Sequence, residues 1–231
     1  MIIAIDGTAA SGKGTLGRTL AMTLGLDYLD TGILYRAVGL LVTRQNLDID
    51  NASATELAAV AETLEISADF NTEFGAEIRS AEVAEAASKL AALPEIRRAL
   101  LEKQRHFAYQ PPGGNGAVLD GRDIGSVVLP DADAKFYVDA AADIRATRRH
   151  LELVANGETL EYSEVLADLI KRDCRDKNRT VAPLIAAQDA FFIDSSYMNA
   201  EEVLSLALSH LKGDIASDGQ AAEHKPATMA L

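Results

Sequence analysis

Short apolar runs alternate along the chain with longer segments in which apolar residues recur every three or four positions. The short runs are rich in β-branched and aromatic residues, as buried parallel strands are. They comprise residues 2–5, 117–119, 134–138 and 191–193. Each run ends at an acidic residue or a turn. The pattern predicts a parallel sheet of about five strands flanked by helices, with a ligand site at the polar ends of the strands.

The longer segments predict helices with a 3.6-residue period. They cover residues 14–24, 31–45, 53–63, 80–107 with a break before Pro94, 140–155, 161–178 and 199–212. Asn156-Gly157 predicts the turn of a helical hairpin. Residues 110–116, with two prolines and three glycines, predict a loop. Residues 64–80 fit neither pattern and predict a small insert with weak strand character, and residues 214–231 predict a disordered tail.

Composition places the chain among globular proteins. It has 231 residues, of which 48% are hydrophobic and 25% charged, enough for one domain or one domain with an insert. Its one cysteine, Cys174, excludes a disulfide framework and a cysteine-rich metal site, and the four histidines share no spacing that suggests a metal site. No apolar run approaches the roughly 20 residues of a membrane span. We therefore expect a cytoplasmic protein.

The net charge of −13 narrows the choice of ligands. General nucleic-acid or anionic-membrane binding requires a basic surface, so we expect neither. A small anionic ligand is still compatible with the net charge, because a cleft can be locally basic.

The segment from Gly7 to Thr15, G-T-A-A-S-G-K-G-T, carries the clearest chemical pattern. Gly7, four residues, Gly12 and Lys13 match the body of a P-loop, which turns its backbone N–H groups toward phosphates. A strand is predicted before the segment and a helix after it, so the positive end of the helix adds to the site. The alternative, a glycine-rich turn beside an unrelated lysine, explains neither the spacing nor this context.

The loop departs from the common pattern at Gly14, where a serine or threonine usually follows the lysine. Thr15 is the nearest hydroxyl that could help to hold Mg²⁺, through a water molecule. Asp6, just before the loop, is interpreted as a turn residue rather than a catalytic base.

Two groups of arginines flank the predicted hairpin: Arg145, Arg148 and Arg149 before it, and Arg172, Arg175 and Arg179 after it. Their spacings of three and four place each group on one side of a helix. Phosphoryl transfer needs positive charge around the moving group, and a mobile lid would bring it there. The alternative is a pair of solvated helix faces whose arginines pair with carboxylates such as Asp176.

The chain resembles the nucleoside monophosphate kinases, and among them bacterial cytidylate kinase, over roughly residues 1–212. The resemblance rests on the variant P-loop and, in order, on Asp30–Arg36 (D-T-G-I-L-Y-R), Asp120–Gly125 (D-G-R-D-I-G) and Arg175–Arg179 (R-D-K-N-R). It implies a three-layer α/β P-loop domain over residues 1–213, with a monophosphate-binding insert at about 31–107 and a short helical lid at about 145–163.

The same resemblance implies an activity and its reactants. The enzyme would be a monomer that transfers the γ-phosphoryl group of ATP to CMP and dCMP with Mg²⁺ as cofactor. The ATP-binding residues would be Gly7, Thr8, Ala9, Ala10, Ser11, Gly12, Lys13, Gly14 and Thr15. The CMP-binding residues would be Thr31, Tyr35, Arg36, Ser88, Arg97, Arg122, Asp123, Asp176 and Arg179. The catalytic residues would be Lys13, Arg36, Arg122 and Arg179.

Within that set, Ser88, Arg97 and Asp123 would read the base. A carboxylate and a hydroxyl can accept hydrogen bonds from the cytosine amino group, while a guanidinium donates to N3 and O2. Uracil reverses two of these positions.

Other functions remain open at this point. The acceptor could be UMP, AMP or shikimate, and a slow nucleotide-hydrolysing switch is a further alternative, although the N-K-x-D guanine motif of GTP switches is absent from the sequence. The stretch between Leu64 and Arg79 is several residues shorter than is usual in the resembled family, which leaves acceptor affinity and sugar preference undecided.

Overall fold

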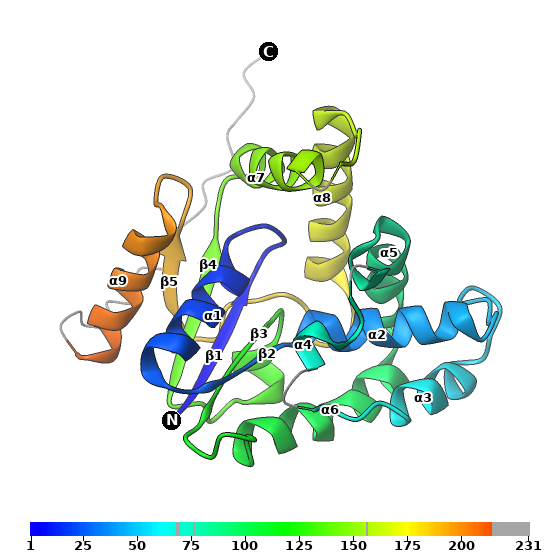
Figure 1. The fold of residues 1–231 in the computed structure, drawn as a ribbon, viewed down its shortest axis with the longest axis horizontal. Coiled ribbons are helices and arrows are strands. Elements are labelled where there is room, and N and C mark those ends of the chain that lie inside the picture. The colour runs from blue at the N-terminus through cyan, green and yellow to red at the C-terminus, as the bar shows by residue number, and fades with distance from the viewer. Residues whose placement is uncertain (68–69, 76, 156, 214–231) are drawn as a thin grey trace.

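A computed structural model describes residues 1–67, 70–75, 77–155 and 157–213, and the predicted tail therefore lies outside the described residues. The described chain contains a five-stranded, fully parallel sheet in the order β2-β3-β1-β4-β5. Its strands are β1 (Ile2–Gly7), β2 (Asp27–Asp30), β3 (Ala117–Gly121), β4 (Ala134–Asp139) and β5 (Phe191–Asp194). The predicted α/β class and strand number are confirmed (Figure 1).

Strand β2 was not recognised in the sequence. It reads D-Y-L-D and forms one edge of the sheet, pairing with β3 alone. An edge strand is covered less completely than a central one, and here only Leu29 is fully buried. A four-residue segment with acidic ends therefore offers no apolar run to detect.

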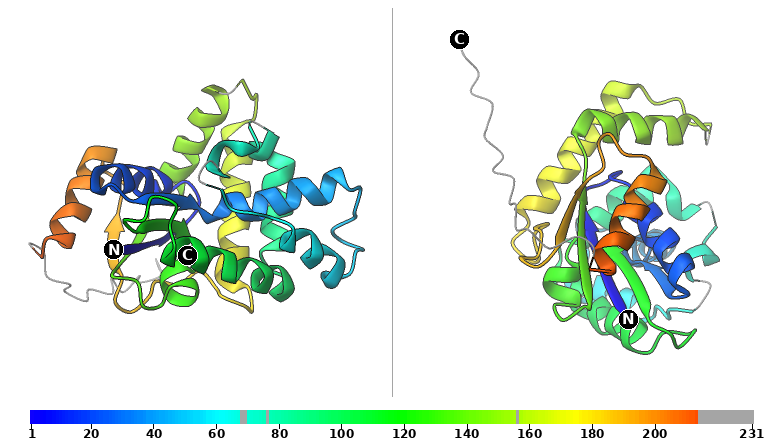
Figure 2. Two further views of the ribbon diagram at one scale, coloured as in Figure 1. Left: turned by 60° about the horizontal axis from the view of Figure 1, so that its bottom comes forward. Right: turned by 90° about the vertical axis from the view of Figure 1, so that its left-hand side faces the viewer.

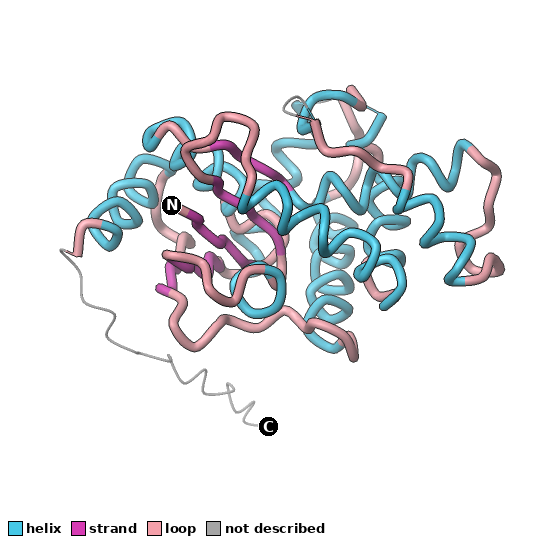
Figure 3. The backbone as a smooth tube through the Cα atoms, turned by 90° about the horizontal axis from the view of Figure 1, so that it is seen from below, coloured by secondary structure: helices cyan, strands magenta, loops and turns pink. Residues whose placement is uncertain are grey.

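Helices cover both faces of the sheet, which gives three layers (Figures 2 and 3). Alternate residues of β1 point to opposite faces. Ile3 and Ile5 pack into a core shared with α1 (Lys13–Leu24) and α9 (Ala200–Leu211). Ala4 faces a larger core built on the other side.

The larger core belongs to the helices between β2 and β3. They are α2 (Thr31–Arg44), α3 (Ala54–Glu62), α4 (Phe70–Glu73), the 3₁₀ turn η1 (Glu77–Arg79), α5 (Ala81–Leu90) and α6 (Pro94–Tyr109). The boundaries follow local signals: Ser80 accepts a hydrogen bond from the N–H of Val83 to start α5, and Pro94 occupies the first turn of α6.

The predicted strand character of residues 64–80 is wrong, since the described residues there contain a helical turn and a 3₁₀ turn but no strand. Phe70 and Ile78 are both buried in the larger core, and they tie these short turns to the helices around them. Packing onto helices, rather than strand pairing, thus fixes the segment.

The predicted hairpin consists of α7 (Ala142–Ala155) and α8 (Tyr162–Asn178), which pack on each other. Leu153, Val165 and Leu169 form a small core that also includes Ala9 of the glycine-rich loop. Figure 1 shows the hairpin beyond the end of the sheet at which β1 gives way to that loop. Among the described helices, none has the length and apolar character needed to cross a bilayer.

Candidate nucleotide site at the carboxyl ends of the strands

The glycine-rich loop joins β1 to α1, and two glycines give it its shape. A Cβ on Gly7 would lie 2.0 Å from the carbonyl oxygen of Val138, so no larger residue fits against β4. Gly12 precedes α1 with a φ of 90°, a left-handed conformation that glycine adopts without strain. Lys13 begins α1, and its Nζ lies 3.6 Å from Oδ2 of Asp120 at the end of β3.

Neighbouring elements hold the loop from three sides. Thr8 Oγ1 donates a hydrogen bond to Oδ1 of Asp139 at 2.5 Å. Ser195 Oγ donates to the carbonyl oxygen of Ser11 at 2.8 Å, and Arg145 Nη1 donates to that of Ala9 at 3.2 Å. These contacts therefore hold the loop in a fixed position relative to the elements around it.

A cavity of about 520 Å³ lies next to this loop. All nine residues predicted to bind CMP line it, together with Ala9, Ala10 and Lys13. They come from the loop, the β3 end, the helices α2, α5 and α6, and α8 with the residue that follows it. The remaining predicted ATP-binding residues stand outside this cavity: Gly7, Thr8, Ser11, Gly12, Gly14 and Thr15. Thr15 is exposed on α1.

The cavity is locally basic although the chain is acidic. Its lining carries seven basic side chains, Lys13, Arg36, Arg97, Arg122, Arg149, Arg172 and Arg179. It carries five acidic ones, Asp30, Asp123, Glu152, Glu158 and Asp176. The excess of two positive charges, seven minus five, contrasts with −13 for the whole chain. Such a lining suits a phosphorylated ligand.

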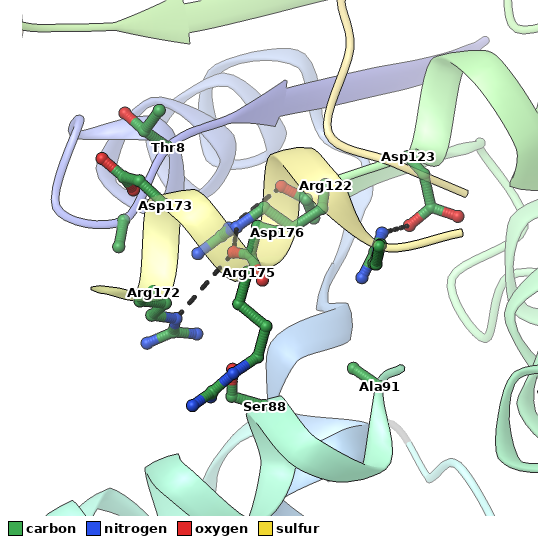
Figure 4. A network of polar contacts seen from close by, with 12 residues as sticks. Thr8, Ser88, Ala91, Arg122, Asp123, Arg172, Asp173, Arg175 and Asp176 are labelled. Carbon is green, nitrogen blue, oxygen red and sulfur yellow. Dashed lines mark hydrogen bonds and ion pairs between the residues drawn. The ribbon is translucent and has the colours of Figure 1, made fainter. Parts of the chain in front are cut away.

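Arg122, Arg172 and Asp176 form the centre of this charge cluster (Figure 4). Arg122 Nε donates to Oδ2 of Asp176 at 2.8 Å, and Arg172 Nε lies 4.0 Å from the same oxygen. Burial, reinforced by the charge of Arg122, lowers the pKa of Arg172 to about 10. Within the described part of the chain, Arg172 Nε is buried without a hydrogen-bond partner. An anion in the cavity would supply that partner.

The three residues predicted to read the base lie in the same cavity. One carboxylate oxygen of Asp123 accepts a hydrogen bond from Arg97, and the other accepts one from Arg179 Nη2 at 3.2 Å. The Arg97 guanidinium also lies over the Tyr35 ring, 5.9 Å from its centroid. Burial raises the pKa of Asp123, while Arg97 and Arg179 oppose that shift. Ser88 Oγ accepts a hydrogen bond from Arg175 Nη1 at 2.6 Å.

Some members of the two predicted arginine groups line the cavity, and others bond to the protein around it. Arg149, Arg172 and Arg179 line the cavity. Arg145 is buried against Asp173, with 2.6 Å between Nη2 and Oδ2, and Arg148 donates to the carbonyl oxygen of Ser195 at 2.6 Å. Arg145 therefore pairs with a carboxylate, as the alternative expected, but it is buried rather than on a solvated helix face.

Two aspartates missed by the sequence reasoning support the site. Asp120 accepts a hydrogen bond from the Tyr28 hydroxyl at 2.8 Å and faces Lys13. Burial and, next, Asp30 raise the pKa of Asp120 to about 6. Its position at the end of a buried strand was the available signal.

Asp6 is the second of these aspartates, and its interpretation as a turn residue is wrong. It belongs to β1, and its two oxygens accept hydrogen bonds from the N–H groups of Ile124 at 2.7 Å and Gly125 at 2.8 Å. These two residues begin η2 (Ile124–Val128), a π-helical turn that directly follows Arg122 and Asp123. Burial raises the pKa of Asp6 to about 7.

The oxygen-bearing groups near the loop fit a phosphate-held Mg²⁺ rather than a protein cage. Among the described residues no group of three or more His, Cys, Asp or Glu side chains could hold a metal. Mg²⁺ commonly takes one or two protein oxygens and completes its shell with water and substrate phosphates. Thr15 at the start of α1 and Asp120 beside Lys13 carry such oxygens.

A parallel sheet, a glycine-rich loop leading into a helix and an arginine-lined cavity together define a P-loop protein that binds phosphorylated ligands. Residues 3–213 match the family model described as cytidylate kinase. The chain belongs to the cytidylate kinase family, as the resemblance predicted.

Curated relatives agree with this assignment, and a solved structure shares the fold. A cytidylate kinase of Paramagnetospirillum magneticum is 51% identical over 207 residues, which cover 90% of this chain and 95% of the relative. One of Xanthobacter autotrophicus is 50% identical over 209 residues, covering 90% and 96%. A crystal structure of an uncharacterized protein from Eubacterium ventriosum shares the fold, with a TM-score of 0.52 and 12% identity over 92% of this chain and 98% of that one.

Proposed function

We propose that this protein transfers the γ-phosphoryl group of ATP to CMP and dCMP, giving ADP and CDP or dCDP. The observation that carries the proposal is the shared cavity, in which Lys13 of the loop lies with all nine residues expected on the acceptor side. Family membership supports the same reaction, because the relatives bear the name cytidylate kinase.

On the donor side, the loop would hold the phosphates of ATP. Its backbone N–H groups and the N-terminus of α1 favour negative charge. Burial, followed by Arg122, lowers the pKa of Lys13, while Asp120 and Asp30 oppose that shift. In its charged form the Lys13 ammonium would move from Asp120 to the terminal phosphates.

On the acceptor side, Arg36, Arg122 and Arg179 would hold the monophosphate and neutralise charge as the phosphoryl group moves. Guanidinium groups suit two-pronged contacts with phosphate oxygens. Asp176 already orients Arg122 and would take a sugar hydroxyl with its remaining lone pairs. The Thr31 hydroxyl donates to the Asp120 carbonyl at 2.7 Å, so it faces a ligand as an acceptor.

Recognition of cytosine would rest on Ser88, Arg97 and Asp123, with Tyr35 packed nearby. Each carboxylate oxygen has two lone pairs, so Asp123 can accept from the cytosine amino group while Arg97 and Arg179 hold it in place. Arg97 would donate to N3 and O2. The N3–H and O4 of uracil would face groups of the wrong polarity, which costs roughly 1–3 kcal/mol for each unpaired group.

Mg²⁺ would neutralise charge on the ATP phosphates, and Thr15, through water, would help to hold it. The helical hairpin at about 145–163 would act as a lid that closes over the reactants and excludes water as a competing acceptor. We also propose that the enzyme is a monomer of the cytoplasm, consisting of one P-loop domain over residues 1–213 with its acceptor insert at about 31–107.

The test is ADP production from ATP and Mg²⁺ with CMP, dCMP, UMP, AMP or no acceptor, measured side by side. We expect strong turnover with CMP and dCMP alone. Turnover with another acceptor would keep the phosphoryl-transfer chemistry and overturn the base assignment. ADP release that no acceptor changes would identify a nucleotide hydrolase instead.

A further inference from the structure

Arg175 connects two walls of the cavity without lining it. It lies on α8, and its guanidinium reaches Glu85 and Ser88 on α5. Figure 4 shows Arg175 extending from α8 toward Ser88. Nη2 lies 2.9 Å from Oε1 of Glu85, while Nη1 lies 3.2 Å from Oε2 of Glu85 and 2.6 Å from Oγ of Ser88. Glu85 and Ser88 are three residues apart and so share one face of α5.

The contact restricts what the Ser88 hydroxyl can do. A serine hydroxyl offers one donor and two lone pairs, and a guanidinium can only donate. Arg175 therefore occupies one lone pair of Ser88 and leaves the O–H and the other lone pair for the cavity. Ser88 is 7% exposed and lines that cavity, so its remaining hydrogen-bonding capacity points to a ligand rather than to bulk water.

Glu85 keeps Arg175 in this position. Both of its carboxylate oxygens accept from the guanidinium, and this pairing lowers the pKa of Glu85. A planar guanidinium carries several N–H donors in a fixed fork, so it can donate to a carboxylate and a hydroxyl together.

The same contact links α8 to α5. Arg172 and Asp176, three positions before and one after Arg175, line the cavity from α8, while Ser88 lines it from α5. Arg175 thus joins the α5 wall of the cavity, which carries Ser88, to the α8 wall, which carries Arg172 and Asp176.

We propose that Arg175 is a positioning and specificity-determining residue: held by Glu85, it sets the orientation of the Ser88 hydroxyl and so contributes to the choice of cytosine over uracil. The inference rests on the proposed function, since it assumes that Ser88 contacts the acceptor base.

The test measures kcat and KM with CMP and with UMP for Arg175→Ala, Glu85→Gln, Ser88→Ala and the double variant Arg175→Ala/Ser88→Ala. Arg175→Ala is expected to lower kcat/KM for CMP about tenfold or more, the size of one lost hydrogen bond to a charged group. The value for UMP should fall less, so the CMP-to-UMP ratio drops, while KM for ATP stays unchanged. Glu85→Gln should shift the ratio in the same direction by a smaller factor, and it keeps the test available if Arg175→Ala does not fold.

The double variant separates positioning from general structural damage. If Arg175 acts through Ser88, Arg175→Ala has no further effect on the CMP-to-UMP ratio once Ser88 is alanine. Lys89→Gln is the matched control, because Lys89 also lies on α5 and pairs with another element, Asp50, at 2.8 Å without touching Ser88. It should leave the ratio at the wild-type value.

Equal losses with CMP and UMP, additive effects in the double variant, or the same ratio change in Lys89→Gln would each overturn the inference. The wild-type enzyme in the same assay reports on the proposed function separately. A wild type that does not turn over CMP would refute that function, whereas an active wild type with an unchanged ratio in Arg175→Ala refutes this inference alone.

Discussion

Arg172 offers a test in which stability and activity should move in opposite directions. Its Nε is buried without a hydrogen-bond partner in the described structure, and the nearest carboxylate oxygen, on Asp176, is 4.0 Å away and already bonded to Arg122. The free protein therefore keeps a poorly compensated charge in the cavity. Replacing Arg172 with methionine keeps an unbranched apolar stem and removes that charge.

The size of the effect follows from the pKa. Its decrease to about 10 from the ordinary value of an arginine corresponds to roughly 3 kcal/mol against the charged form. Because 31% of the side chain is exposed to solvent, screening reduces this penalty to about 1–2 kcal/mol. Arg172→Met should thus raise the free energy of unfolding by about 1 kcal/mol or more in the absence of nucleotide.

Activity should fall at the same time. A phosphate in the cavity would give the Arg172 guanidinium the partner it lacks, so the variant loses a charge-assisted contact and about tenfold or more in kcat/KM for CMP. Urea unfolding with and without CMP measures the first effect, and steady-state kinetics measure the second. Arg98→Met, at an exposed position on α6, is the control. A variant that is less stable than wild type without nucleotide, or as active as wild type, would refute the reasoning.

Three further predictions address the loop, the base pocket and the π-helical turn. Lys13→Ala should cut turnover by about 10²-fold or more by removing charge from the terminal phosphates, with little change in melting temperature because its ion pair with Asp120 is 3.6 Å long; near-normal turnover would remove Lys13 from the mechanism. Asp123→Ala should erode discrimination against UMP in acceptor kinetics and should cost about 3 kcal/mol in urea unfolding, since it leaves Arg97 and Arg179 without their shared carboxylate; an unchanged CMP-to-UMP ratio would contradict its role. The folded-state pKa of Asp6, about 7, lies above its ordinary value of 3.8, so the folded protein holds a proton that the unfolded chain releases. The stability it contributes is therefore greatest below pH 3.8 and declines as the pH rises to about 7. Urea unfolding across that range should show a decline of up to about 4 kcal/mol in wild type relative to Asp6→Asn; parallel pH profiles would refute this.

Most of the sheet and the long helices could be predicted from the sequence, because the patterns that mark them are local. The predicted helix at 161–178 and the observed α8, Tyr162–Asn178, differ by a single residue at the start. Apolar periodicity sets such helices, and nearby residues mark their ends. β2 and the turns between residues 64 and 80 escaped prediction because distant packing partners, rather than local pattern, decide their structure.

All nine residues expected on the acceptor side line one cavity, but the sequence did not reveal how the charged side chains there pair. The spacing of Arg172, Arg175 and Arg179 predicted one shared side of a helix, yet Arg179 follows the end of α8 and Arg175 turns toward Glu85, 90 positions away in sequence. Asp6 likewise reaches Ile124 across 118 positions. Spacing along one helix cannot reveal partners that only the folded chain brings together.

The central claim is that the terminal phosphoryl group of ATP moves to a cytidine monophosphate. The most direct measurement follows ATP labelled at the γ-phosphoryl group, incubated with Mg²⁺ and CMP, and identifies the labelled product. The account predicts that the label appears in CDP, that dCMP gives labelled dCDP, and that Lys13→Ala nearly abolishes both. Label found in inorganic phosphate, or transferred to UMP as readily as to CMP, would contradict it.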